Sequence, residues 1–315
     1  MTPAPGTVAR GMVSVPGVEP PWELPVVVVR GANPGPTFVI TSGVHAAEYV
    51  PIAAVTEFTR LLDPATLRGT VIAVLIVNTP GFFLRSIYVN PRDGRNINRA
   101  FPGSEQGDPS ERVAAFISQE VVAGADAYLD AHGGDLIEAL TPLIIWERVG
   151  SPDVDAGSEG MANAFGLDYV MAMSLDSIAG TASGSAAQAG IPAITAEAGQ
   201  QGICDPVAVA GYLSGLQRVA AHLGMIDRDP DQPRAPVLLR EFAWLRADVT
   251  GVWRPTVTAG SRVSEGQEVG QLRDLFGEPL LSVSAGASGV VIFCVTSLPV
   301  QAGDPLLGIG VLASS

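Results

Sequence analysis

Lysine is absent from this sequence of 315 residues, because all 18 basic side chains are arginines. Several chemistries require a lysine amine: Schiff-base and pyridoxal-phosphate catalysis, phosphate binding by a Walker-type loop, and attachment of lipoate or biotin to a carrier. The sequence therefore excludes all of them. Histidine is also scarce, with only His45, His132 and His222, so a histidine-based site must draw on these three.

Basic charge is in short supply too. The 32 acidic residues outweigh the 18 basic ones and give a net charge of −14 at pH 7. Nucleic acids and anionic membranes favour a basic protein face, so we expect no nucleic-acid partner and no membrane partner. The longest apolar runs, 26–29 and 71–77, fall far short of the roughly 20 residues that span a bilayer. This balance favours a small-molecule or peptide partner.

Cysteine is limited to Cys204 and Cys294, and the first 17 residues lack the apolar core of a signal peptide. Free thiols in a reducing compartment are the usual state of such cysteines. We therefore predict a cytoplasmic protein. The composition leaves its oligomeric state open, with a homo-oligomer as one option.

Short apolar runs alternate with helical patterns along the first two thirds of the chain. This alternation predicts an α/β fold, a mostly parallel mixed sheet flanked by helices, within a catalytic domain at 1–227. Ligands of such sheets bind at the carboxyl ends of the strands. We expect helices at 48–62, 109–122 and 206–223 and strands at 26–29, 37–42, 71–77, 127–131, 143–146, 168–173 and 193–197.

The chain changes character near residue 228. Segment 228–236 contains three prolines and reads as a linker, and short strands with glycine turns then predict a small all-β domain at 235–315. Its pattern at 260–270 and 289–291 is similar to a biotinyl or lipoyl carrier module. Without a lysine, no biotin or lipoate can be attached to this domain. We therefore expect the domain to be a lid or an assembly surface beside the active site.

The first chemical signal is TSGVHAAEYV, where His45 and Glu48 follow a strand that ends near Ser42. Gly43 permits an unusual turn, and the histidine and glutamate can then converge on one point. Imidazole and carboxylate together suit zinc. Taken alone, the pair fits ordinary capping or surface roles better than metal binding.

The second signal is YLDAHGGD, in which Asp130 and His132 lie on one face of a predicted strand. A catalytic zinc usually takes three protein ligands, and His132 would complete a set with His45 and Glu48. Asp130 could then hold the imidazole of His132 by a hydrogen bond. The alternative is a hydrogen-bonded core histidine, and we expect a structural role for His222.

The third signal is the arginine-dense segment PRDGRNINRAFPG at 91–103. Asn98 and Arg99 offer adjacent amide and guanidinium donors, which suit recognition of a substrate carboxylate. Arg85, Arg92 and Arg95 lie nearby in sequence. A solvated loop is the alternative reading of this arginine cluster.

The fourth signal is Glu197, which ends an apolar strand in AITAEAGQQG. Poor solvation at such a position raises the pKa of a carboxyl group toward the range useful for taking up and returning a proton. A structural pairing of Glu197 with an arginine is the alternative.

Taken together, these segments resemble the succinylglutamate desuccinylase and aspartoacylase family, which has the zinc carboxypeptidase fold. The motifs occur in family order: G-x-H-x-x-E at 43–48, N-x-N-R-x-F-P-G at 96–103, D-x-H at 130–132 and A-E-x-G at 196–199. The resemblance implies one zinc ion per chain, held by His45, Glu48 and His132. It also implies Glu197 as general base and then general acid, and Asn98 with Arg99 as the grip on a substrate carboxylate.

Members of this family also place an arginine upstream of the N-R pair to polarise the scissile carbonyl. Arg85 is the first candidate for that catalytic role, and Arg92 is the next. Arg92 is also a candidate for binding the substrate. True carboxypeptidases contribute a tyrosine late in the catalytic domain, and it has no clear counterpart here. Its absence makes exopeptidase activity a less favoured prediction.

These expectations define a function. We expect a zinc-dependent hydrolase that cleaves an amide bond of a small carboxylate-bearing substrate, in the manner of an N-acyl amino acid deacylase. The alternatives are a zinc carboxypeptidase acting on a peptide or a γ-linked conjugate, and a catalytically silent binding protein with the same fold. Segments 146–160 and 174–190, rich in glycine, serine and alanine, are expected to be loops that line the specificity pocket.

Overall fold

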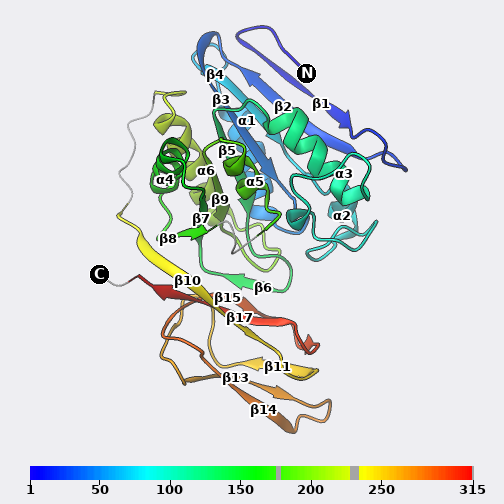
Figure 1. The fold of residues 1–315 in the computed structure, drawn as a ribbon, viewed down its shortest axis with the longest axis vertical. Coiled ribbons are helices and arrows are strands. Elements are labelled where there is room, and N and C mark those ends of the chain that lie inside the picture. The colour runs from blue at the N-terminus through cyan, green and yellow to red at the C-terminus, as the bar shows by residue number, and fades with distance from the viewer. Residues whose placement is uncertain (175–178, 228–233, 314–315) are drawn as a thin grey trace.

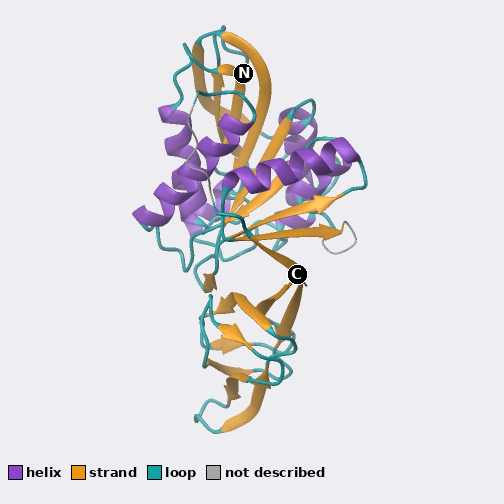
Figure 2. Cartoon of the chain, turned by 90° about the vertical axis from the view of Figure 1, so that its left-hand side faces the viewer, coloured by secondary structure: helices purple, strands orange, loops and turns teal. Residues whose placement is uncertain are grey.

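A computed structural model describes residues 1–174, 179–227 and 234–313. An upper part with helices and strands continues into a lower part built of strands (Figure 1). In the side view, helices lie on both sides of the upper sheet (Figure 2). Residues 228–233 of the expected linker and 175–178 of the expected pocket segment lie outside the described residues.

The upper sheet has parallel strands at its centre, with β4, β3, β5 and β9 adjacent in that order and all parallel. Antiparallel neighbours follow at both sides, since β2 pairs with β4 and β7 pairs with β9 in opposite directions. The expected fold class, a mostly parallel mixed sheet flanked by helices, is confirmed. The strands are β1 (Thr7–Ser14), β2 (Glu23–Arg30), β3 (Asn33–Ser42), β4 (Arg68–Val74), β5 (Ala127–His132), β7 (Leu143–Arg148), β8 (Tyr169–Ser174) and β9 (Ala193–Glu197).

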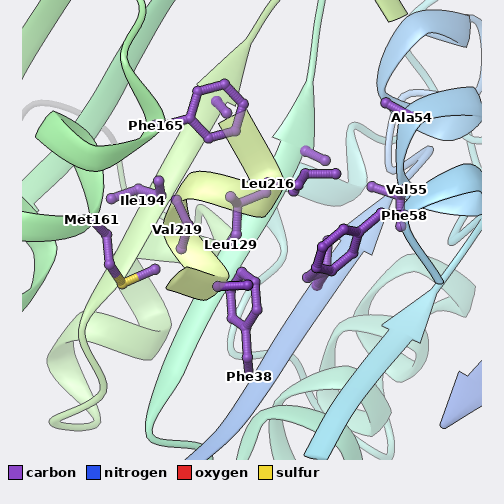
Figure 3. Packing of buried hydrophobic residues seen from close by; sticks show 14 of the residues in the cluster. Phe38, Ala54, Val55, Phe58, Leu129, Met161, Phe165, Ile194, Leu216 and Val219 are labelled. Atoms are coloured by element: carbon purple, nitrogen blue, oxygen red, sulfur yellow. The ribbon is translucent and has the colours of Figure 1, made fainter. Parts of the chain in front are cut away.

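Two hydrophobic layers cover this sheet. One lies under α1 (Tyr49–Leu61), α4 (Pro152–Phe165) and α6 (Pro206–His222), where Phe58 and Leu216 pack with Phe38 of β3 (Figure 3). The other lies under a second set of helices and buries Trp22. Because both faces are covered, the central strands are continuous apolar runs. The second set comprises η1 (Ile97–Arg99), α3 (Pro109–Phe116), η2 (Ile117–Val122) and α5 (Ala182–Gln188). A short helix, α2 (Thr79–Leu84), follows β4.

Two of the segments expected to be loops contain helices. α4 begins at Pro152, and Pro is favoured in the first helical turn because its missing N–H needs no partner there. α5 begins after Thr181, whose side chain accepts a hydrogen bond from Gly184 N. The small residues of these helices gave no apolar periodicity, so the loop prediction was wrong for 152–160 and 182–188.

The C-terminal strands extend the upper sheet. β10 (Val237–Arg246) pairs in parallel with β8 and antiparallel with β17 (Pro305–Leu312), and β15 (Gly289–Val295) and β12 (Arg262–Val263) follow. A second sheet of four strands packs around the buried Trp253. Its members are β11 (Gly251–Pro255), β13 (Glu268–Arg273), β14 (Pro279–Ser284) and β16 (Pro299–Val300).

One short strand of the upper part is held by the lower part. β6 (Glu138–Leu140) pairs with β15, and the Thr141 N–H donates to the Ile292 carbonyl at 2.8 Å. The Thr296 N–H donates to the Ile137 carbonyl at 2.7 Å. The loop that follows His132 is thus fixed by the C-terminal strands. Among the described residues, no helix combines the length and apolar character needed to cross a membrane.

Candidate active site

The candidate site forms where three parallel strands end. Ser42 of β3 pairs with Ala131 of β5, and His132 of β5 pairs with Glu197 of β9. After β3 the chain turns at Gly43, which has a φ of 64° and a position where a Cβ would lie 3.2 Å from the Ile76 Cα. A side chain would be strained and crowded there.

The turn brings His45 and Glu48 against His132. The Glu48 Oε1 lies 2.8 Å from the His45 Nδ1, and the Oε2 lies 2.9 Å from the His132 Nδ1. The Gly133 N–H also donates to Oε2 at 3.1 Å. One ligand atom from each of the three side chains lies within 4.8 Å of the other two, and all three residues are buried. Two imidazoles and one carboxylate are a donor set of catalytic zinc sites, so these residues fit the ion.

Electrostatics favour a carboxylate at Glu48. Burial alone raises the pKa of Glu48, but the charges and hydrogen bonds of His132 and His45 outweigh burial and lower this pKa to about 2. Glu48 is therefore an anion at neutral pH, which is the form that coordinates a metal.

Asp130 orients His132 from the other side of the ring. Its Oδ2 lies 2.8 Å from the His132 Nε2, while its Oδ1 accepts a hydrogen bond from Thr41 at 2.7 Å. Burial opposes a charge on His132, but Asp130 and Glu48 outweigh it and raise the pKa of the imidazole well above its usual value. The contact leaves Nδ1 of His132 facing Glu48, as a metal ligand would require.

Glu197 ends β9 directly opposite His132. Burial raises the pKa of its carboxyl group well above the usual range, His132 opposes this shift, and Glu48 and Glu138 add to it. The backbone beneath it is fixed, because the Tyr212 hydroxyl donates to the Ala196 carbonyl at 2.9 Å. Glu197 therefore combines a position beside the metal-ligand group with a raised proton affinity.

Asn98 and Arg99 lie in η1, next to the same group. The buried Asn98 places its Nδ2 3.2 Å from the His132 Nε2, and its Oδ1 accepts a hydrogen bond from the Ala182 N–H at 2.9 Å. Arg99 is exposed, and its Nη1 lies 2.5 Å from the Asn98 carbonyl oxygen. Asn98 thus contacts a predicted metal ligand, while the Arg99 guanidinium is open to solvent.

Among the described residues, neither candidate upstream arginine makes a hydrogen bond or ion pair with the metal-ligand group. Arg92 donates to the carbonyls of Pro20 at 2.6 Å and Pro21 at 3.1 Å, and its guanidinium lies 5.0 Å from the centre of the Trp22 ring. Arg85 caps α2 in the left-handed conformation, with a φ of 53°, and is exposed. The role of either arginine in catalysis or substrate binding stays a prediction.

Sequence reasoning missed two residues that contact His45. The Asn96 Oδ1 lies 2.9 Å from the His45 Nε2 and accepts a hydrogen bond from the Asn98 N–H at 2.8 Å. Asn96 belongs to the N-x-N-R motif, which was a usable signal. The Tyr88 ring stacks on the His45 ring with centroids 4.8 Å apart, and nothing in the sequence around Tyr88 indicated this contact.

Two further acidic residues follow His132. Asp135 is buried, and Glu138 begins β6. Burial raises the pKa of Glu138 to about 8, with added repulsion from Asp135 and Glu48. Glu138 is therefore mostly protonated at neutral pH, and its neutral carboxyl group lies near the metal-ligand group.

A buried carboxyl group lies further from the strand ends. The Oε1 of Glu147 accepts hydrogen bonds from Ser183 at 3.0 Å and Thr181 at 3.3 Å, while its Oε2 is buried without a partner among the described residues. Burial raises the pKa of Glu147 to about 7. Glu147 supports the start of α5, which in turn holds Asn98 through Ala182.

Comparisons with known proteins place the chain in a family. Residues 34–223 match the succinylglutamate desuccinylase/aspartoacylase catalytic domain. The N-alpha-acetyl-L-2,4-diaminobutyric acid deacetylase of Halomonas elongata is 28% identical over 257 residues, which cover 80% of this chain and 74% of the relative.

Solved structures share the fold over nearly the whole chain. The succinylglutamate desuccinylase/aspartoacylase of Rhodobacter sphaeroides has a TM-score of 0.87 and 26% identity, covering 98% of this chain and 96% of the other. The product-bound ectoine utilization protein EutE (DoeB) of Ruegeria pomeroyi has a TM-score of 0.88 and 24% identity, covering 96% and 95%. Since the catalytic-domain match spans more than half of the chain, this protein belongs to the succinylglutamate desuccinylase/aspartoacylase family.

Proposed function

We propose that this protein is a zinc-dependent deacylase that hydrolyses the amide bond of an N-acyl amino acid. The observation that carries the proposal is the convergence of His45, Glu48 and His132 at the strand ends, with Glu197 opposite His132. Membership of the family supports amide hydrolysis as the reaction.

His45, Glu48 and His132 would hold one zinc ion. When bound, zinc lowers the pKa of a water molecule and polarises the amide carbonyl. Asp130 keeps the His132 ring in the orientation that presents Nδ1, through its contact with Nε2. Such outer contacts tune metal affinity as well as ligand geometry.

Glu197 acts as the proton carrier of the reaction. Its carboxylate takes a proton from the attacking water as the new C–O bond forms, and the same group returns that proton to the departing amine nitrogen. Burial raises the pKa of this carboxyl group, which makes its carboxylate a stronger proton acceptor for the first step.

Asn98 and Arg99 bind the substrate carboxylate in this proposal. The Asn98 side chain lies within the site, and Arg99 supplies an exposed cation whose planar donors match a carboxylate. The rest of the substrate then extends toward the metal-ligand group. The activity of the Halomonas relative makes Nα-acetyl-L-2,4-diaminobutyrate the first compound to assay.

The test begins with the metal content of purified protein and the release of acyl groups from N-acetyl and N-succinyl amino acids. We expect one zinc per chain, loss of hydrolysis on chelation and recovery on addition of zinc. The His45→Ala variant should bind no zinc, and His222→Gln, at the exposed end of α6, should bind it normally.

The same assay separates the alternatives. Faster release of C-terminal residues from dipeptides or γ-linked conjugates would show a carboxypeptidase instead. A protein that binds no stoichiometric zinc and hydrolyses none of these amides would be a silent binding protein, and the proposal would fail.

A further inference from the structure

Tyr88 lies in a backbone conformation that a bulky side chain rarely adopts. Its φ is 66°, and the Val89 N–H donates to the Ile87 carbonyl across it at 2.7 Å, which closes a three-residue γ-turn. A γ-turn with positive φ is rare and strained, and positive φ in an aromatic residue is a true outlier. Strain of this kind persists only where the surroundings impose it, and it gathers at functional sites.

The surroundings fix both ends of this turn. On one side, the N–H of Ser86, which follows α2, donates to the carbonyl of Gly81 within that helix. On the other, the fully buried Asn90 donates through Nδ2 to Asp93 at 2.8 Å and Ser110 at 3.0 Å. The chain between α2 and Asn90 is therefore short and anchored. Of its two residues with positive φ, Arg85 and Tyr88, Tyr88 is the one whose side chain contacts the site.

The strained turn places the Tyr88 ring against a predicted metal ligand. The ring stacks on His45 at 4.8 Å with an angle of 28° between the planes. Tyr88 is nevertheless 46% exposed, so one part of its ring faces His45 while another part faces solvent. A residue that both touches the metal-ligand group and faces the open side can meet a substrate bound there.

The neighbouring arginines Arg85 and Arg92 do not occupy the position beside His45 that Tyr88 occupies. Arg92 is occupied by the carbonyls of Pro20 and Pro21, and Arg85 is exposed at the end of α2 without a contact to the metal-ligand group among the described residues. Of these three polar side chains, Tyr88 is the one that contacts His45.

We propose that Tyr88 is a catalytic residue whose hydroxyl donates a hydrogen bond to the oxygen of the scissile carbonyl as that oxygen gains negative charge. A fixed donor aimed at developing charge stabilises the transition state more than the ground state. The hydroxyl keeps its proton throughout, so the step needs no additional acid or base. This inference rests on the proposed amide hydrolysis and assigns the role expected of an upstream arginine to a tyrosine.

The Tyr88→Phe variant tests this role, because it removes the hydroxyl and retains the ring that stacks on His45. We expect kcat to fall by about 10²-fold with little change in KM, as for the loss of one oxyanion donor. Binding of a phosphonamidate analogue of the tetrahedral intermediate, measured by calorimetry on the zinc-loaded protein, should weaken by a similar factor. Zinc affinity, measured by chelator competition, should stay within about twofold because the ring remains.

Tyr169→Phe in β8 is the matched control, since it removes a hydroxyl outside the site and should match the wild type in all three measurements. Wild-type kcat and wild-type analogue binding in Tyr88→Phe would overturn the inference. Loss of kcat and analogue binding in Arg85→Gln, with Tyr88→Phe unaffected, would overturn it in favour of the arginine. A wild-type protein without zinc-dependent amide hydrolysis would refute the proposed function itself, a result separate from either outcome.

Discussion

His132 and Glu197 lie directly opposite each other where the parallel strands β5 and β9 end. Neighbouring residues in this register project to the same face of the sheet. A predicted metal ligand and a predicted proton carrier are therefore held side by side by backbone hydrogen bonds, and the two roles can be separated by mutation.

The Glu197→Gln variant should retain zinc and lose nearly all turnover. The amide has a similar shape but cannot take up a proton, and general acid–base catalysis contributes about 10²–10⁴-fold to rate. Zinc content by mass spectrometry and kcat measured on one preparation check this. Glu120→Gln, at an exposed position of η2, is the control. Full activity in Glu197→Gln would remove this residue from the mechanism.

The Asp130→Asn variant should weaken zinc binding about 10–100-fold, because replacing the acceptor beside a ligating histidine has that typical effect. Asp130 contacts the His132 Nε2 at 2.8 Å and is fully buried. Chelator competition measures the affinity, with the exposed Asp153→Asn as reference. Unchanged affinity in Asp130→Asn would show that the contact does not orient His132.

The Arg99→Gln variant should raise KM for carboxylate-bearing substrates at least about 10-fold, since charge-assisted hydrogen bonds are worth about 1.5–3 kcal/mol. Arg99→Lys should recover only part of this, because an ammonium group lacks the planar fork. Steady-state kinetics with an N-acyl amino acid and its methyl ester check the assignment. If Arg99→Gln raises KM equally for the acid and for its ester, Arg99 does not bind the substrate carboxylate. Arg254→Gln in β11 serves as the control.

Glu147 makes folding stability depend on pH. Its pKa rises from 4.5 to about 7 on burial, so folding favours the protonated form. The associated stability is present below pH 4.5 and is lost as the pH rises to about 7. The loss amounts to about 3 kcal/mol, since each pH unit between the two pKa values is worth about 1.4 kcal/mol.

The Glu147→Gln variant stays neutral and should not lose this stability. Urea unfolding of the metal-free protein at pH 5 and pH 8 should show a smaller decline for Glu147→Gln than for the wild type. The exposed Glu159→Gln variant should decline as the wild type does. Equal declines in Glu147→Gln and the wild type would contradict a buried, mostly protonated Glu147.

Much of the sheet was predictable because its strands are continuous apolar runs. The strands ending at Ser42, His132 and Glu197 were each expected, and parallel packing explains why residues far apart in sequence meet at one edge. The direction of β7 was not readable, because an apolar run such as LIIW carries no sign of its partner's direction.

The missed parts of the site depend on the path of single loops. Tyr88 reaches His45 through a strained turn, and no residue pattern encodes that turn. Arg85 and Arg92 remain candidates by spacing, because spacing does not fix the direction of a side chain. That direction depends on nearby groups, such as the Pro20 and Pro21 carbonyls that accept from Arg92. The motif spacing thus identified the segment beside the site, but it did not determine which side chain of that segment acts on the substrate.

The pairing of β6 with β15 has a consequence for the order in which the protein becomes active. Glu138, whose pKa is raised in part by the charge of Glu48, begins β6. The partner strand of β6 lies more than 150 residues further along the chain. A shift of this pairing by one residue would turn Glu138 to the opposite face. The loop after His132 can therefore reach its final position only once β15 has folded, so refolded protein should gain its activity at the rate at which the C-terminal strands form.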